Sequence, residues 1–150
     1  MKTIKIQLAI LFLLTFTLSG FCQKLASNQK FDFKSKNPAE WTLVLDAVVA
    51  APKNHKILLE NDMVRVLEVT LAPEEIENLH HHKWPSVIYL QEAGEYIDTD
   101  IDGNIILDSR ELKEPLKLPM TIWKDSEAPH SVTNLSKTQT IRLIRVEVKQ

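Results

Sequence analysis

The chain has 150 residues, of which 44% are hydrophobic and 25% are charged, and these values are ordinary for a single globular domain. A formal net charge of −2 without a basic stripe argues against nucleic acid or an anionic membrane surface as a partner. The single cysteine, Cys22, excludes an intrachain disulfide, so stability must come from a buried core.

Residues 1–22 have the layout of a secretory signal peptide. Two lysines precede the mostly apolar run 6–18, which is too short to span a bilayer comfortably and is followed by small residues. We expect cleavage after Cys22 and export to the periplasm or the outside. A lipid anchor on Cys22 and an uncleaved anchor stay open as alternatives, but a lipoprotein signal favours a small residue where this chain has Phe21.

A leader over residues 23–54 is predicted to precede the folded domain. Its first part, residues 23–37, is polar and lysine-rich, which indicates a flexible segment. Asn37, Pro38 and Glu40 then form a helix-start pattern of cap, proline and acid. The residues that follow, 41–49, are rich in β-branched side chains, so the sequence leaves a short helix and a strand both open there.

From His55 onward, short apolar and β-branched runs are separated by turn residues. The runs cover residues 63–71, 86–90, 94–98, 104–108, 118–123 and 138–148. Pro, Gly and Asp-Gly sequences lie between them, and no helical pattern intervenes. This spacing predicts an all-β domain over residues 55–150, built as a sandwich or a barrel.

Residues 98–105 admit two interpretations. Asp98, Asp100 and Asp102 followed by Gly103 match the start of a calcium-binding loop, but the twelfth position holds Ser109 instead of glutamate. The same residues place Asp-Gly between two β-rich runs, which is typical of a hairpin turn. We expect the hairpin.

Three histidines are candidates for a metal site. In an extended segment, residues two apart share a face, so His80 and His82 can point together while His81 points away, toward solvent. His130 near the start of a later strand could supply a third ligand. By spacing alone, surface or packing histidines without a metal are the better interpretation, and His55 is expected to lie in a loop.

The sequence around these histidines resembles the cupin superfamily. Its first motif contains His-x-His followed by a closing glycine, matched by His80, His82 and Gly94, and its second motif ends in His-x3-Asn, matched by His130 and Asn134. The resemblance covers most of the chain after the leader. It implies a small jelly-roll barrel that holds a divalent transition metal (Fe, Mn, Zn or Ni) through His80, His82 and His130.

The chain departs from the cupin motifs at two positions that matter. The glutamate of the first motif falls at Val87 or Ser86, neither of which is a carboxylate, and the opening glycine falls at Glu74. Without the fourth ligand, the metal would bind more weakly and keep a position open for water or substrate. If Val87 faces the pocket, strand alternation places Tyr89 and Gln91 there too, so these three residues are expected to line it.

Two functions follow from the resemblance. One is a metalloenzyme in which the ion binds a small oxygen-bearing substrate, and the other is a non-catalytic module that captures a small molecule or a metal in the periplasm. No general base stands out, so catalytic residues are not assigned. A homodimer paired through sheet edges is also left open. Asn134 is expected to bind backbone, and Arg65, Arg142 and Arg145 are expected to be solvated.

Overall fold

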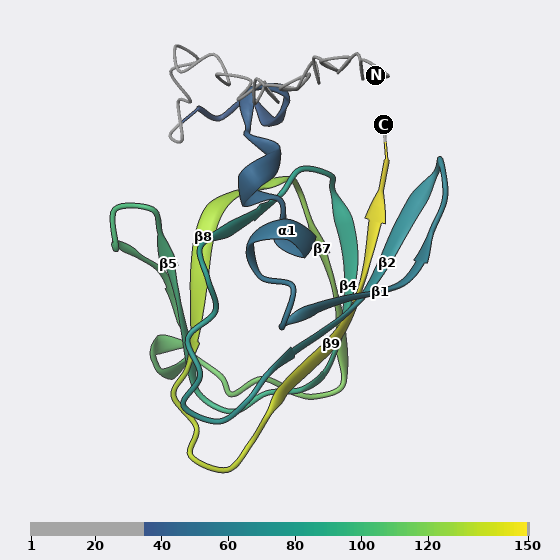
Figure 1. Cartoon of the computed structure of the whole chain (residues 1–150). Coiled ribbons are helices and arrows are strands. Elements are labelled where there is room, and N and C mark those ends of the chain that lie inside the picture. The colour runs from purple at the N-terminus through teal and green to yellow at the C-terminus, as the bar shows by residue number, and fades with distance from the viewer. Residues whose placement is uncertain (1–34, 150) are drawn as a thin grey trace, which may run out of the picture.

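The computed structural model describes residues 35–149 (Figure 1). The predicted signal peptide with Cys22, and residues 23–34 of the predicted leader, lie outside this range. Within residues 35–149, no helix is long and apolar enough to cross a membrane.

The segment before the barrel forms three short helical turns: η1 (Pro38–Glu40), η2 (Leu43–Leu45) and α1 (Ala47–Ala50). Each begins after a side chain that accepts a hydrogen bond from the backbone N–H two residues on: Asn37, Thr42 and Asp46. Ala47 and Ala51 are buried, so this segment packs against the strands instead of extending a sheet. The open choice between helix and strand is thereby decided in favour of helical turns.

Nine strands in the described part of the chain form two antiparallel sheets: β1 (His55–Glu60), β2 (Val64–Leu71), β3 (His80–His82), β4 (Ser86–Glu92), β5 (Tyr96–Asp100), β6 (Ile105–Asp108), β7 (Met120–Lys124), β8 (Glu127–Asn134) and β9 (Ile141–Val148), with a 3-10 turn η3 (Ser109–Glu111) after β6. One sheet has the order β1-β2-β9-β4-β7 and the other the order β3-β8-β5-β6. The two sheets face each other, with α1 between them at one end (Figure 1). This confirms the predicted all-β jelly roll.

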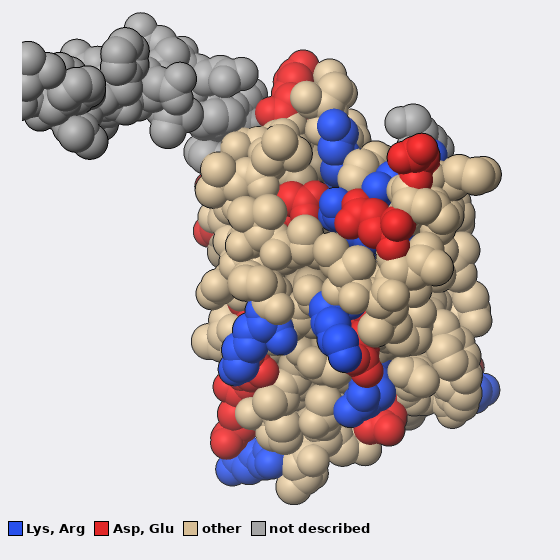
Figure 2. Space-filling view, turned by 45° about the vertical axis from the view of Figure 1, so that its right-hand side comes forward, with Lys and Arg blue, Asp and Glu red and all other residues tan. Residues whose placement is uncertain are grey.

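The apolar core lies between the sheets. Leu71, Ile88, Leu90 and Ile141 form a buried cluster, because alternate residues of β2, β4 and β9 point inward. On the outside, basic and acidic side chains lie close to one another and leave wide uncharged areas between them on the face that Figure 2 shows. Two ion pairs between neighbouring segments are Arg142 with Glu68, at 3.0 Å, and Lys149 with Glu60, at 2.7 Å.

The expectation that Val87, Tyr89 and Gln91 line the pocket is wrong. β4 turns Ser86, Ile88 and Leu90 inward, while Val87 and Tyr89 are 37% and 42% exposed on the outer face, and Gln91 lies outside the cavity lining. The cause is a register offset of one residue, which exchanges the two faces of a strand. Because apolar residues occur on both faces of β4, alternation alone does not show which face is buried.

The Asp-Gly segment forms the expected hairpin between β5 and β6. Gly103 adopts a φ of 81°, a left-handed conformation that glycine accepts without a steric cost. Asp100 Oδ1 accepts hydrogen bonds from the backbone N–H groups of Asp102 and Asn104, at 2.9 and 2.8 Å. The carboxylate of Asp100 therefore stabilises the turn.

Only one of the two glycine positions of the first motif holds a glycine in this chain. Glu74, at the opening position, has a φ of 59°, so this chain places a residue with a Cβ in the conformation that favours glycine. At the closing position, a Cβ on Gly94 would lie 2.5 Å from Ser136 Cβ. Glycine is thus required at position 94 by close packing, whereas Glu74 carries local backbone strain.

Candidate metal centre

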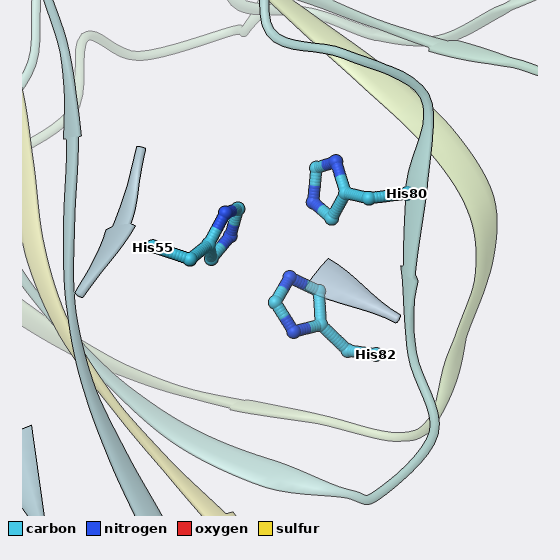
Figure 3. A group of neighbouring side chains, drawn as sticks. All are labelled: His55, His80 and His82. Atoms are coloured by element: carbon cyan, nitrogen blue, oxygen red, sulfur yellow. The ribbon is translucent and has the colours of Figure 1, made fainter. Parts of the chain in front are cut away.

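Four histidines meet inside the barrel at the end that α1 covers. His55 begins β1, His80 and His82 lie on β3, and His130 lies on β8; all four are buried. Ring nitrogens of His55, His80 and His82 lie within 4.8 Å of one another, and their rings point toward a common centre (Figure 3). His130 joins this group through His80, because the two Nε2 atoms are 3.2 Å apart.

Each of the four rings turns its Nδ1 atom toward an outer acceptor. The pairs are His55 with Ala51 O (3.2 Å), His80 with Asn78 O (2.8 Å), His82 with Glu147 Oε1 (2.7 Å) and His130 with Asp98 Oδ1 (3.3 Å, an ion-pair contact). An Nδ1 atom that donates a proton outward leaves Nε2 as the nitrogen with the free lone pair. This arrangement is the one that orients histidines around a metal ion.

The site favours neutral imidazoles at three of the four positions. Burial lowers the pKa of His55 to about 4 and that of His80 to about 2, and it lowers the pKa of His82 well below its ordinary value. The nearby charge of Arg145 lowers the pKa of all three further. Neutral imidazoles can donate a lone pair without first losing a proton.

His130 differs from the other three in its electrostatics. Burial by itself lowers its pKa, but the carboxylates of Asp98 and Glu127 outweigh this and raise the pKa above the ordinary value. Two unprotonated Nε2 atoms at 3.2 Å would repel each other through their lone pairs. The close approach of His80 and His130 therefore needs a proton or a cation between them.

Charged side chains surround the four rings. Arg145 is only 4% exposed and its Nη1 lies 2.7 Å from Glu127 Oε2, so the expectation of a solvated Arg145 is wrong. Strand β9 turns Arg145 and Glu147 inward. A buried charge needs a partner of opposite charge, and Glu127 is that partner for Arg145. Arg65 is also largely buried and pairs with Asp46 at 3.0 Å, whereas Arg142 is exposed as expected.

Two acidic groups at the site have pKa values close to neutral pH. Burial raises the pKa of Glu77 to about 7, and its Oε1 atom lies 3.3 Å from His55 Nδ1. Burial also raises the pKa of Glu147 to about 7, although Arg145 and Arg65 act in the opposite direction. Glu127 behaves differently, because Arg145, His130 and Lys124 outweigh its burial and lower its pKa to about 2.

His81 points away from the centre, but it does not face solvent. It is 1% exposed, its Nε2 lies 2.8 Å from the backbone oxygen of Thr42, and its ring is 5.2 Å from that of Trp41. The expectation of a solvent-facing His81 is therefore wrong. The helical segment before β1 covers this side of β3, which the sequence of β3 alone does not reveal.

Asn134 acts on the backbone, as expected. It is fully buried, and its Nδ2 donates to the backbone oxygens of Leu71, Ala72 and Gln139 at 3.0, 3.0 and 2.8 Å. Its Oδ1 accepts from the N–H of Ser136. Asn134 thus joins the ends of β2 and β8 to the loop before β9, and its hydrogen bonds are to backbone groups instead of to the histidines.

His55 is the site residue that the sequence prediction missed. The sequence predicts a loop there, but His55 is the first residue of β1 and points inward. The backbone N–H groups of Asn54 and His55 both donate to Ala51 O, which fixes the chain at the start of the strand. Its ring lies 4.6 Å from that of His80 and 5.1 Å from that of His82. No spacing rule links a lone histidine to a pair 25 residues later, so only the fold brings them together.

A cavity of about 210 Å³ adjoins the histidines. Its charged lining consists of Glu77, Asp98, Lys124, Glu127 and Arg145, and apolar side chains of β2, β4, β8 and β9 form much of the remainder. The combination of convergent ligands and an apolar chamber is typical of a small-molecule site.

Comparison with solved structures identifies the architecture. A cupin domain from Bordetella pertussis Tohama I superposes with a TM-score of 0.51 at 18% sequence identity, and the match covers 64% of this chain and 92% of that domain. This chain has the cupin fold. An RmlC-like cupin from Methanocaldococcus jannaschii (TM-score 0.46, 13% identity, 63% and 78% coverage) and the polyketide cyclase RemF from Streptomyces resistomycificus (TM-score 0.43, 21% identity, 64% of each chain) are also similar. No family model and no curated protein matches the sequence.

Within the cupin fold, the histidines of the two motifs lie on neighbouring strands. His80 and His130 are direct partners across the β3–β8 pair, and His82 lies two residues along β3. The predicted glutamate position is split, since Ser86 faces inward and Val87 faces outward. The three predicted ligands are thus assembled with His55, while metal binding by them and pairing of two chains remain predictions.

Proposed function

We propose that this protein is an exported cupin that binds a divalent transition metal (Fe, Mn, Zn or Ni) at His55, His80, His82 and His130. The observation that carries the proposal is the shared orientation of the four imidazoles, each with Nδ1 engaged outward. Imidazole donors suit iron, nickel and zinc. Export rests on the sequence pattern of residues 1–22.

The spacing of the donor atoms supports a single shared ion. Two nitrogens bound to one ion at about 2.1 Å are about 3.0 to 3.4 Å apart, for angles between octahedral and tetrahedral values. The distance between His80 Nε2 and His130 Nε2, 3.2 Å, falls in this range. Ring nitrogens within 4.8 Å in the His55, His80 and His82 group can converge further through small ring rotations.

The bound ion would act as a Lewis acid toward an oxygen of a small ligand. The residues of the chain have separate tasks: Glu147 and Asp98 orient two imidazoles, Arg145 offers a buried cation beside the ligand, and the apolar walls exclude water. We propose a small oxygen-bearing molecule as the ligand, either as the substrate of a metalloenzyme or as the cargo of a binding module.

One observation favours the non-catalytic module. The carboxylates around the centre are already in ion-pair contacts: Glu77 with His55, Glu147 with His82, Asp98 with His130 and Glu127 with Arg145. A general base must reach the substrate proton, and groups committed to ion pairs do this poorly. Oxygen uptake or substrate loss across a panel of small molecules would support the enzyme, whereas tight binding without product would support the module.

Metal content tests the proposal directly. We expect the mature protein, purified from the compartment to which it is exported, to contain close to one divalent ion per chain by elemental analysis. His80→Ala and His130→Ala should each remove most of the ion. His81→Gln is the matched control, because His81 is buried on the same strand but points away from the centre. Metal-free wild-type protein whose stability is unchanged by a chelator would refute the proposal.

A further inference from the structure

The cavity changes from polar to apolar along β9. Its inward residue Arg145 lies at the level of the histidines, and the next inward residue, Leu143, is paired with Val69 on β2 and Leu90 on β4. Ile141 follows one step further on and is buried in the core cluster. The side chains of all five residues, Arg145, Leu143, Val69, Leu90 and Ile141, line the same cavity.

The opposite sheet changes in the same direction. On β8, His130 faces the centre and Val132, two residues on, lines the cavity beside the core cluster. The end of β8 lies near the start of β9, because Asn134 donates to the backbone oxygens of Leu71 and Gln139. The apolar ends of both sheets therefore coincide, and the cavity has one polar and one apolar end.

Further apolar side chains surround the apolar end. Leu116, Leu118 and Met120 are partly buried and pack against the core cluster at this end of the barrel. A ligand seated in the cavity must therefore place its apolar part here, because a polar group would lose its hydrogen bonds to water without gaining a partner.

The polar end offers two unused donors on one side chain. Arg145 Nε and Nη2 are buried and have no hydrogen-bond partner among residues 35–149, although Nη1 of the same side chain is bound to Glu127. With Glu77 ionised, the charged lining carries three negative charges (Glu77, Asp98, Glu127) and two positive ones (Lys124, Arg145). A divalent ion at the four histidines turns this excess of one negative charge into an excess of one positive charge.

From this gradient we infer that the ligand is a single-headed amphiphile. Its head is a monoanionic group with two oxygens that bind the metal and Arg145, and its body is a short hydrocarbon chain that fills the apolar end. At about 30 Å³ for each water-sized group, a cavity of about 210 Å³ holds roughly seven non-hydrogen groups, of which the head takes two or three. The inference rests on the proposed metal centre.

A series of hydroxamates that differ only in chain length tests this ligand class. Acetohydroxamate, butanohydroxamate, hexanohydroxamate and octanohydroxamate carry the same two-oxygen head, which becomes monoanionic when it loses its proton on binding a metal ion. We expect calorimetry on the metal-loaded protein to show about fourfold tighter binding for each added methylene, the value for complete burial, up to a chain of about five carbons. Beyond this length the gain should stop, because the apolar part of the cavity is full.

Neighbouring residues of β9 provide a matched pair of variants. Leu143→Gln should abolish the gain with chain length and leave the affinity for acetohydroxamate nearly unchanged, because Leu143 lines the apolar part of the cavity. Ile144→Gln should keep the full gain, because Ile144 lies on the outer face of the same strand. Leu143→Phe keeps the site apolar and should shorten the longest chain that still gains affinity, which tests the inference if Leu143→Gln does not fold.

The outcomes separate this inference from the metal centre. Equal affinity for all chain lengths in a protein that holds its metal and binds acetohydroxamate would overturn the amphiphile and leave the metal centre intact. A protein that takes up no metal would overturn both. A chain-length gain that survives unchanged in both Leu143 variants would also overturn the inference, since the chain would then bind elsewhere.

Discussion

His80 on β3 and His130 on β8 are 50 residues apart in the sequence, yet they are direct partners in an antiparallel pair and their Nε2 atoms are 3.2 Å apart. β3 contains only three residues, so its position depends on pairing with β8. The carboxylate of Asp98 on β5, the next strand in the sheet, then orients His130 from the other side. One sheet thus carries three of the four histidines of the candidate centre, His80, His82 and His130.

Metal binding should stabilise the fold. An ion that binds only the folded protein adds about 2.7 kcal/mol at a free concentration of 100 times its Kd, which for a domain of this size corresponds to about 10 °C in Tm. Thermal unfolding followed by tryptophan fluorescence, with and without a chelator, measures the shift. The same measurement on His80→Ala should show no shift with added metal, and an equal shift in that variant would place the ion at another site.

Loss of His55 should weaken metal binding without abolishing it. If His55 is the fourth ligand, His55→Ala removes one of four donor bonds, and the metal affinity should fall at least tenfold while His80, His82 and His130 still hold the ion. Competition with a fluorescent chelator gives the affinity. An unchanged affinity would show that His55 is a packing residue and that the centre has only the three ligands predicted from the sequence.

The stability of the metal-free protein should fall as the pH drops below 6.5. Burial lowers the pKa of His55 to about 4 and that of His80 to about 2, so both are neutral in the folded state over a range in which the unfolded chain takes up their protons. The stabilisation is present above pH 6.5 and is lost toward pH 4. Urea unfolding of His55→Gln between these limits should show a slope smaller by about 1.4 kcal/mol per pH unit; an unchanged slope would contradict the burial of a neutral His55.

Glycine at position 74 should stabilise the protein. Glu74 has a φ of 59°, and this conformation costs a residue with a Cβ about 1 to 2 kcal/mol, partly offset by the greater chain entropy of unfolded glycine. We expect Glu74→Gly to be about 1 kcal/mol more stable than Glu74→Ala in urea unfolding. The alanine variant controls for loss of the side chain. Equal stabilities would show that the turn relaxes away from the left-handed conformation.

The amino-acid sequence by itself determined the strand-rich architecture and three of the four histidines. Turn residues between short β-branched runs admit few architectures, and the spacing of His80 and His82 places two imidazoles on one face of any extended segment. The cupin motifs added His130 and Asn134. These features are local or belong to a known pattern, so they could be found without the fold.

Only the tertiary structure decided which other residues reach the centre. His55 and Arg145 belong to no local pattern, and their inward positions depend on where β1 and β9 pair with β2 and β4. The inner face of β4 and the burial of His81 were mispredicted for the same reason, because a strand with apolar residues on both sides shows its buried face only when neighbours pack against it. Side-chain direction in this barrel is a property of strand register, and register is set by contacts between residues far apart in the chain.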